Sequence, residues 1–207
     1  MKNFPITDPK TGKTYWISRA MAVVGIIVLH DIEVGNNPKD ITDKLYYLIS
    51  QRGPGCPDFV GKWQCTCGYL DFDETLLEAL RREIYEELGL DISSPEVINY
   101  GGPYLVTITD HPSHDPRQNV CFRFIINLDY NQVKEMLENG TINGRGKERG
   151  GEDNEISSIS IVSEEYFKNM EPDAFAFNHY ELLNSHCNGS IFDNSIITRS
   201  SWVRGDD

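Results

Sequence analysis

The chain has 207 residues, of which 39% are hydrophobic and 25% charged, so we expect one packed domain and exclude a chain that is disordered throughout. Its 32 acidic residues outnumber its 19 basic residues, which gives a formal net charge of −13. This excess of negative charge argues against nucleic acid and against an anionic membrane surface as partners, because each of these binds a basic face.

The cysteines and the apolar runs indicate a cytoplasmic protein. The five cysteines are odd in number and their spacings form no disulfide framework, which is typical of a reducing compartment. The apolar run Ala20–Leu29 is too short to span a bilayer, and no signal peptide precedes it. We therefore expect no membrane association.

The N-terminal part of the chain predicts β-structure. Residues 1–19 contain two β-like runs around the turn sequence "DPKTGK", so we expect an N-terminal hairpin extension. Such a hairpin can exchange between two copies of the chain, and a homodimer is one assembly that this allows. "AVVGIIVLH" (Ala22–His30) is rich in β-branched residues and predicts a central strand, and Lys44–Arg52 predicts the next one.

The pattern changes to a helix over Glu74–Leu88. Apolar residues recur there at helical spacing and predict a buried stripe, and Gly89 is a suitable stop. The stripe consists of Leu77, Leu80, Ile84 and Leu88.

The second half of the chain adds strands and short helices. Strands are predicted in "VINYGGPYLVTIT", "NVCFRFIINLD" and "ISSISIV", and helices in "NQVKEMLENG", "SEEYFKNM" and "DAFAFNHYELLNSHC". This order predicts a mixed sheet between helices, an α/β (α+β) fold, followed by a polar tail over residues 188–207.

The predicted helix carries three carboxylates on one face. At about 100° per residue, Glu83, Glu86 and Glu87 fall within about 100° of arc. Ala79 lies among them on this projection and leaves room above the face. Three converging carboxylates suit a hard divalent cation such as Mg²⁺, which keeps waters and shares substrate phosphates. The alternative is an ordinary solvated acidic face, but no lysine lies among these residues.

These residues also carry a family resemblance. "GYLDFDETLLEALRREIYEELGL" (68–90) resembles the Nudix box, which reads G, five residues, E, seven residues, R-E-U-x-E-E-x-G-U with U aliphatic. Every defined position is filled, by Gly68, Glu74, Arg82, Glu83, Ile84, Glu86, Glu87, Gly89 and Leu90. Many relatives have Pro-Gly-Gly where this chain has Thr66, Cys67 and Gly68, and Gly where it has Asp73. These departures concern the shape of the loop and leave the carboxylates in place.

The resemblance implies a Nudix-type α/β/α sandwich over residues 20–187. It also implies Mg²⁺- or Mn²⁺-dependent hydrolysis of a nucleoside diphosphate linked to another moiety. By carry-over, the metal ligands would be Glu83, Glu86 and Glu87, to which the loop can add the Gly68 carbonyl. Glu74 and Arg82 would orient these ligands, and a following acidic loop would supply a further ligand or general base, with Glu152, Asp153 and Glu155 as candidates.

Weaker similarities point to a substrate. "HDPRQNVCFRFIINL" and "DAFAFNHYELL" are similar to segments of Nudix ADP-ribose pyrophosphatases, so the favoured reaction converts ADP-ribose to AMP and ribose 5-phosphate. Arg52 and Arg117 are candidate phosphate clamps, because a guanidinium matches phosphate oxygens in pairs. The alternative for each arginine is a structural ion pair. Tyr69 is one of several aromatic residues that could stack on a base, the alternative being a place in the core.

Three other functions fit parts of this pattern. The box alone does not separate the favoured reaction from a nucleoside triphosphate pyrophosphohydrolase. A non-hydrolytic, nucleotide-sensing Nudix module would commonly carry a damaged box or an added DNA-binding segment, and neither is found here. A prenyl-diphosphate isomerase would place His-Pro after the cysteine near the box, whereas Cys67 is followed by Gly68 and Tyr69.

Overall fold

The structure is a computed structural model that describes residues 4–17, 20–35, 37, 39–98, 100–109, 119–151 and 153–192. The strands are β1 (Phe4–Thr7), β2 (Thr14–Ile17), β3 (Met21–Val34), β4 (Ile41–Arg52), β5 (Trp63–Gln64), β6 (Thr66–Tyr69), β7 (Tyr104–Thr109), β8 (Val120–Asp129) and β9 (Ile156–Ser163). The helices are α1 (Leu76–Leu88), α2 (Tyr130–Glu138), α3 (Glu164–Lys168) and α4 (His179–Cys187), with short 3-10 turns η1 (Gly146–Arg149), η2 (Pro172–Ala174) and η3 (Ser190–Phe192).

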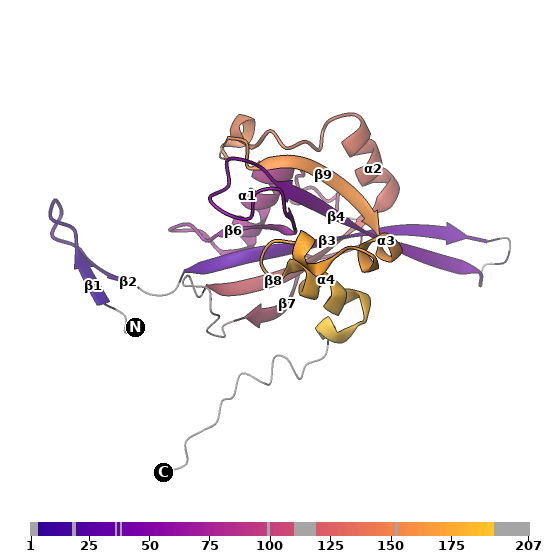
Figure 1. Cartoon of the computed structure of the whole chain (residues 1–207), viewed down its shortest axis with the longest axis horizontal. Helices are drawn as coiled ribbons and strands as arrows, with labels where there is room; N and C mark the ends of the chain where they lie inside the picture. The colour runs from indigo at the N-terminus through magenta and orange to yellow at the C-terminus, as the bar shows by residue number, and fades with distance from the viewer. Residues whose placement is uncertain are drawn as a thin grey trace, which may run out of the picture.

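Strand β3 organises the seven-stranded main sheet (Figure 1). It pairs antiparallel with β4 and β6 and parallel with β8, which carries β7 at its outer edge. Strand β4 then leaves β3 and pairs with β5 and β9. The sheet is therefore mixed, as predicted.

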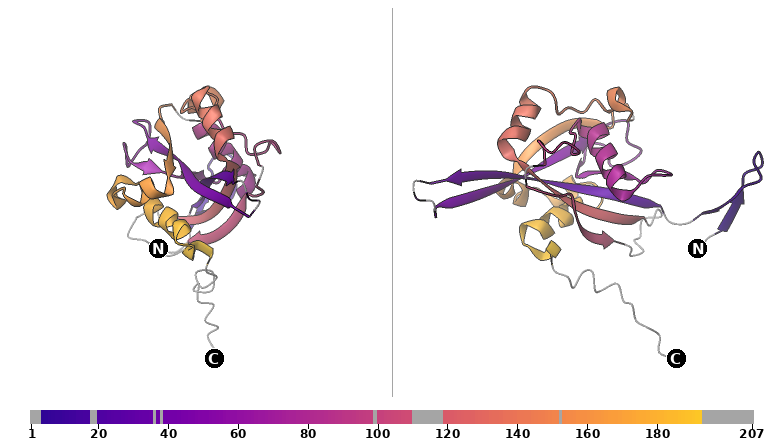
Figure 2. Two further views of the ribbon diagram at one scale, coloured as in Figure 1. Left: turned by 90° about the vertical axis from the view of Figure 1, so that its right-hand side faces the viewer. Right: turned by 180° about the vertical axis from the view of Figure 1, so that it is seen from behind.

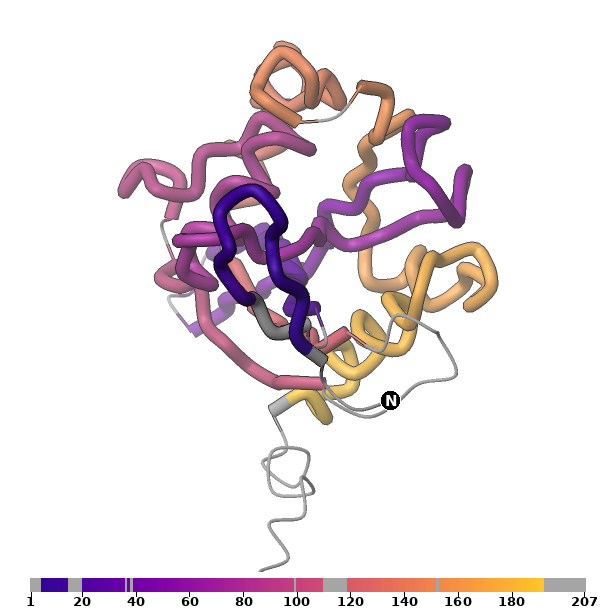
Figure 3. The backbone as a smooth tube through the Cα atoms, turned by 90° about the vertical axis from the view of Figure 1, so that its left-hand side faces the viewer, coloured from indigo at the N-terminus to yellow at the C-terminus, as the bar shows by residue number. Residues whose placement is uncertain are grey.

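Two hydrophobic cores flank the sheet because alternate residues of β3 face opposite sides. Val23, Ile27 and Leu29 pack with α1 and α2, whereas Val24 and Ile26 pack with α3 and α4. The views from the side and from behind show these helix pairs on opposite faces (Figure 2). The backbone tube in Figure 3 shows the same arrangement, with α1 in magenta and α4 in yellow-orange on opposite sides of the central strands. The predicted α/β fold with a mixed sheet is confirmed.

Helix α1 has strong local signals at both ends. The Thr75 hydroxyl accepts a hydrogen bond from the Glu78 backbone, and the Glu78 side chain accepts one from the Thr75 backbone, forming a capping box. Gly89 ends the helix in the left-handed region, at φ 77°. The interpretation of Ala79 was wrong, because Ala79 is fully buried in the core beside Leu80 and leaves no room above the acidic face.

The last helix is shorter than predicted. Residues 173–177 form no part of α4, since Ala176 donates a backbone hydrogen bond to Trp63 and Phe177 has a φ of 55°. These two features end the preceding segment, and α4 begins only at His179. In the same way, β7 begins at Tyr104, after Gly101 and Gly102 with positive φ.

The predicted N-terminal hairpin is present as β1 and β2. It forms its own two-stranded sheet, which Figure 1 shows apart from the main sheet. At the other end of the molecule, the paired ends of β3 and β4 project beyond the helices (Figure 1). Among the described residues, no helix combines the length and the apolar character needed to cross a membrane.

Candidate active site

Strand β6 and helix α1 place Glu83 directly on the backbone of Gly68. A Cβ added to Gly68 would lie 2.0 Å from Cδ and 2.0 Å from Oε1 of Glu83. Only glycine leaves the carboxylate this position. The carboxylate of Glu83 therefore packs directly against the backbone of Gly68.

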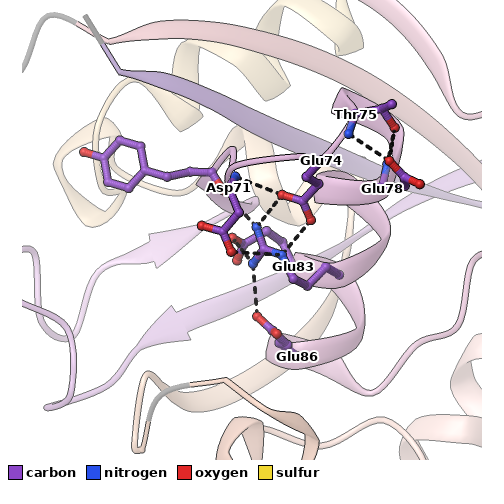
Figure 4. Close-up of polar contacts among 8 residues, drawn as sticks. Asp71, Glu74, Thr75, Glu78, Glu83 and Glu86 are labelled. Atoms are coloured by element: carbon purple, nitrogen blue, oxygen red, sulfur yellow. Dashed lines mark hydrogen bonds and ion pairs between the residues drawn. The ribbon is translucent and has the colours of Figure 1, made fainter. Parts of the chain in front are cut away.

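Arg82 holds the acidic face together. Its Nε and Nη2 donate to the two oxygens of Glu74 at 2.8 and 3.0 Å, and Nη2 also donates to the Tyr69 carbonyl at 2.9 Å. Its Nη1 donates to Glu83 at 2.8 Å and to Glu86 at 3.2 Å. Figure 4 shows Glu74, Glu83 and Glu86 turned toward the point where these contacts meet. The hydrogen bonds from Arg82 lower the pKa of Glu74, which therefore stays ionised.

The carboxyl groups of Glu83 and Glu87 are largely shielded from solvent, and this raises the pKa of both. Burial raises the pKa of Glu83 to about 7, and Arg82 opposes this shift while Glu86 and Glu155 add to it. Burial, followed by the charges of Glu83 and Glu155, raises the pKa of Glu87 well above its usual range. A proton or a cation bound to this pair would reduce the cost of burying negative charge and the repulsion between the two carboxylates.

Glu87 has a buried carboxylate oxygen that lacks a hydrogen-bond partner among the described residues. It is 7% exposed, and its Oε1 accepts a long hydrogen bond from Gln64 Nε2 at 3.5 Å. Its Oε2 is buried and has no hydrogen-bond partner within the described residues. Buried polar atoms are nearly always paired, so an orphan carboxylate oxygen indicates a place for a bound cation or proton.

One cavity of about 590 Å³ brings most of these groups together. Its volume lies in the usual range for small-molecule sites. The predicted site residues that line it are Arg52, Gly68, Tyr69, Arg82, Glu83, Glu87 and Glu155. Further lining residues are Asp58, Cys67, Asn119, Cys121, Arg123, Phe177 and His179.

Glu86 and Glu74 lie outside the cavity wall. Glu86 pairs with Arg82, and Glu74 positions Arg82 from the loop before α1. In the acidic loop, Asp153 pairs with Lys147 at 2.9 Å, and both side chains are exposed, which leaves Glu155 as the described acid that reaches the cavity. Glu152 and Arg117 lie outside the described residues.

Arg52 lines the cavity but is held by protein groups. Its Nε and Nη2 donate to the backbone carbonyl and the carboxylate of Asp58 at 3.0 and 2.8 Å. Its Nη1 donates to Gln64 at 2.6 Å, and its guanidinium stacks on the Phe177 ring. The structural ion pair considered for Arg52 is therefore present. Tyr69 is half exposed at the cavity, where its hydroxyl accepts a hydrogen bond from Asn119.

The sequence analysis missed Arg123 and His179. Arg123 is a charged residue within the apolar run of β8, and that interruption was its only signal in the sequence. His179 is buried, and its Nδ1 accepts a hydrogen bond from the Cys65 backbone at 3.1 Å. Burial, with Arg123 and Arg52 nearby, lowers the pKa of His179 to about 3, so this residue is a neutral wall of the cavity.

The carboxylate and carbonyl oxygens of this site are the ligand types that a hard divalent cation prefers, but the side chains do not converge on one point in this structure. Within the described residues, no group of three or more His, Cys, Asp or Glu side chains is positioned to hold a metal ion. In this structure the Glu83 and Glu86 carboxylates are paired with the guanidinium of Arg82. The orphan oxygen of Glu87 and the Gly68 surface under Glu83 are the features that fit Mg²⁺ or Mn²⁺.

Comparisons with solved structures find similar folds at low identity. The NUDIX domain of Shewanella oneidensis NrtR complexed with ADP ribose is 16% identical, with a TM-score of 0.53 over 88% of this chain and 93% of that one. A MutT/nudix family protein from Enterococcus faecalis is 15% identical, with a TM-score of 0.56 over 89% of this chain and 69% of that one.

A bifunctional NMN adenylyltransferase/ADP ribose pyrophosphatase from Francisella tularensis, complexed with AMP and a Mn ion, is 16% identical. Its TM-score is 0.55 over 82% of this chain, which corresponds to 42% of that enzyme. A search of curated proteins finds no match. The family model of the NUDIX domain matches residues 39–184, well over half of the chain. The protein therefore belongs to the Nudix family.

Proposed function

We propose that the protein is a metal-dependent hydrolase that cleaves the diphosphate of a nucleoside diphosphate linked to another moiety. The observation that carries this proposal is the set of carboxylates Glu83, Glu87 and Glu155 on the wall of one cavity. Glu87 has an oxygen with no partner among the described groups, and Glu83 lies on the Gly68 backbone. Such a wall would repel a diphosphate unless cations lay between them.

The residues that would hold Mg²⁺ or Mn²⁺ are Glu83 and Glu87 with the Gly68 carbonyl, joined by Glu86 if Arg82 releases it. When bound, the ion supplies charge neutralisation at the phosphate oxygens and lowers the pKa of a bound water. Glu74 and Arg82 position this face, since Arg82 bonds both the loop and the helix.

Glu155 is the favoured general base, and Glu152 stays a sequence prediction. Glu155 lines the cavity, and its charge acts on both Glu83 and Glu87. A carboxylate in this place can take a proton from the attacking water. The water oxygen then bonds to phosphorus as the bond from phosphorus to the bridging oxygen breaks, and the bridging oxygen leaves with the second phosphate.

ADP-ribose is the proposed substrate, giving AMP and ribose 5-phosphate. The sequence segments that resemble ADP-ribose pyrophosphatases support this choice. So do two of the similar folds, one solved with ADP ribose and one described as an ADP ribose pyrophosphatase. Tyr69 is the proposed stacking partner of the base, since its ring is half exposed at the cavity.

We further propose a cytoplasmic enzyme with an N-terminal extension (residues 1–19), a Nudix domain (20–187) and a C-terminal tail (188–207). The separate β1–β2 sheet supports the first boundary. A homodimer formed through this hairpin is the proposed assembly, and nucleic acid and membranes are not proposed as partners because of the net charge of −13.

The test is product analysis in Mg²⁺ with ADP-ribose, NADH, a nucleotide sugar and the nucleoside triphosphates. Wild type is compared with Glu87→Gln, and Glu33→Gln, an exposed acid in β3 that pairs with Lys44, is the matched control. We expect AMP and ribose 5-phosphate from ADP-ribose with wild type and Glu33→Gln, and their loss with Glu87→Gln. Release of pyrophosphate from triphosphates would instead identify a triphosphate pyrophosphohydrolase. A panel that stays intact would overturn the proposal.

A further inference from the structure

Arg123 is a second residue at the cavity with a buried polar atom that lacks a partner among the described residues. It projects from β8 into the same cavity as Glu83 and Glu87. Its Nε is buried and has no hydrogen-bond partner in the described part of the chain. Its whole guanidinium forms no hydrogen bond or ion pair with the residues that are described.

The surroundings of Arg123 do little to compensate its charge. The ionisable groups that raise the pKa of Arg123 are Cys121, Cys65 and Glu181, of which Glu181 is exposed on α4. Burial outweighs all three and lowers the pKa of Arg123. An arginine stays charged in proteins, and a buried charge without a partner is strongly unfavourable. The position therefore favours an anionic ligand.

The register of the sheet places Arg123 on the floor of the cavity. Val24 of β3 pairs with Cys67 of β6 on one side and with Arg123 of β8 on the other. All three residues line the cavity, so they share one face of the sheet. Two strand spacings separate the backbones of β6 and β8, roughly 10 Å in all. Arg123 thus arises from the far side of the cavity relative to Gly68.

The cavity therefore holds two orphan groups of opposite sign that do not meet each other. A cation would compensate the unpaired Glu87 Oε2, and an oxyanion would accept a hydrogen bond from the unpaired Arg123 Nε. A ligand made of a divalent cation bound to a phosphorylated molecule carries both complements. Neither a neutral molecule nor a free cation would satisfy both groups.

Two other arginines show why the cavity position matters. The guanidinium of Arg52 is engaged by Asp58 and Gln64, so it has little left to offer a ligand. Arg81 also has a buried Nε without a partner, but it does not line the cavity. An orphan nitrogen alone therefore carries no conclusion, and Arg123 differs because its side chain lines the same cavity as Glu83, Glu87 and Glu155.

We propose that Arg123, rather than Arg52, binds an oxyanion of the substrate at the floor of the cavity. The oxyanion is a phosphate or carboxylate group, either the diphosphate itself or a further anionic group on the attached moiety. This inference names the anion-binding residue of the proposed substrate site and rests on that proposal.

The test measures binding, so that it does not depend on turnover. Calorimetric titrations use a non-hydrolysable methylene analogue of ADP-ribose, the same analogue with an added 2′-phosphate, and adenosine as the neutral probe. Each is titrated in EDTA and in Mg²⁺ into wild type, Arg123→Met and Arg123→Lys. Arg81→Met is the matched control. Thermal unfolding of each variant checks the fold, and Arg123→Lys retains a cation if Arg123→Met does not fold.

We expect Arg123→Met to weaken the binding of an anionic probe roughly 10- to 100-fold, the worth of one charge-assisted hydrogen bond or two. Arg123→Lys should recover part of this loss, and adenosine binding and Arg81→Met should show no change. An equal loss for both analogues identifies the diphosphate as the partner. A loss confined to the extra affinity of the 2′-phosphate identifies a further anionic group.

Affinities within twofold of wild type for both analogues would overturn the inference, as would a wild type that binds neither analogue. The outcomes that refute the proposed function differ from those that refute this inference. If the panel of substrates stays intact while binding of the analogues still depends on Arg123, hydrolysis is wrong and the anion site stands. If hydrolysis occurs and Arg123→Met binds normally, the hydrolase proposal stands and this inference is wrong.

Discussion

The backbone of Gly68 and the carboxylate of Glu83 occupy adjoining space with no room for a methyl group between them. A Cβ on Gly68 would lie 2.0 Å from Cδ of Glu83. Gly68 is in a strand and not in the left-handed region of the backbone, so the need for glycine comes from the close approach alone. The box glycine is therefore explained by the carboxylate that rests on it.

Gly68→Ala should damage activity far more than stability. The Glu83 carboxylate is the flexible end of its side chain, so it can move away from the new methyl group at little cost to the fold. A displacement of about 1 Å at a reacting centre can cost roughly 100-fold in rate. We expect such a loss in kcat/KM with a nearly unchanged melting temperature. Gly35→Ala, in the projecting β3–β4 loop where a Cβ would meet Asp40, is the control and should keep full activity. A Gly68→Ala protein with wild-type activity would contradict this account.

Arg82 and Glu74 should act as one unit. Lysine at position 82 keeps the charge but loses the paired hydrogen bonds to Glu74 and the bond to the Tyr69 carbonyl. We expect Arg82→Lys and Glu74→Gln each to lower kcat/KM by roughly 100-fold, by the same displacement argument. The double variant should be little worse than the poorer single variant, because both changes break one network. Arg81→Lys serves as the control. Effects that multiply in the double variant would show that the two residues act independently.

Magnesium should reverse the stability order of wild type and Glu87→Gln. Burial raises the pKa of Glu87, so the folded protein holds a proton that the unfolded chain has lost, and stability falls as pH rises above 4.5. In EDTA, Glu87→Gln should therefore be the more stable protein, on the order of 1–3 kcal/mol, with a difference that widens as pH rises above 4.5. Saturating Mg²⁺ at 100 times its Kd should stabilise wild type by about 2.7 kcal/mol and the variant much less. Chemical denaturation with and without Mg²⁺ measures both effects, and equal stabilisation of the two proteins would exclude Glu87 as a ligand.

His179 should make the protein sensitive to acid. Its pKa is lowered to about 3 by burial, so below pH 6.5 the unfolded chain binds a proton that the folded protein does not. The stability that neutral His179 contributes is complete above pH 6.5 and is lost as pH falls toward 3. Between pH 7.5 and 5 the loss should be about 2 kcal/mol, at 1.36 kcal/mol per pH unit below 6.5. His179→Asn offers the Cys65 backbone an acceptor without the titration, so its stability should vary less with pH. His186 remains in both proteins and cancels in the difference. Parallel pH profiles for the two proteins would refute this assignment.

The local parts of the fold and site were open to prediction from the sequence. The capping residue Thr75, the stop at Gly89 and the apolar period define α1 within a few residues. That Glu83, Glu87 and Gly68 lie close together could be predicted because the box fixes their spacing within one strand, one loop and one helix. The β-branched run of β3 identified the central strand for a similar reason, since a strand buried on both faces has little choice of composition.

The rest depends on contacts between distant segments. Arg123 enters the cavity because β8 lies parallel to β3 with Arg123 opposite Val24, and nothing in the sequence specifies that pairing. Arg52 is engaged because the loop after β4 brings Asp58 back onto it. A helical projection places Glu86 and Glu87 on one face, but the surrounding sheet buries Glu87 in the cavity wall and leaves Glu86 outside it.

The central claim is that Glu83 and Glu87 hold a divalent cation that binds the diphosphate of the substrate. The most direct measurement is an anomalous difference map from crystals of the wild-type protein grown with Mn²⁺ and the methylene analogue of ADP-ribose. We predict a manganese peak between the Glu83 and Glu87 carboxylates and the Gly68 carbonyl, with the diphosphate of the analogue bound to the same ion. A cavity without manganese, or an analogue whose diphosphate lies away from these two carboxylates, would contradict the account.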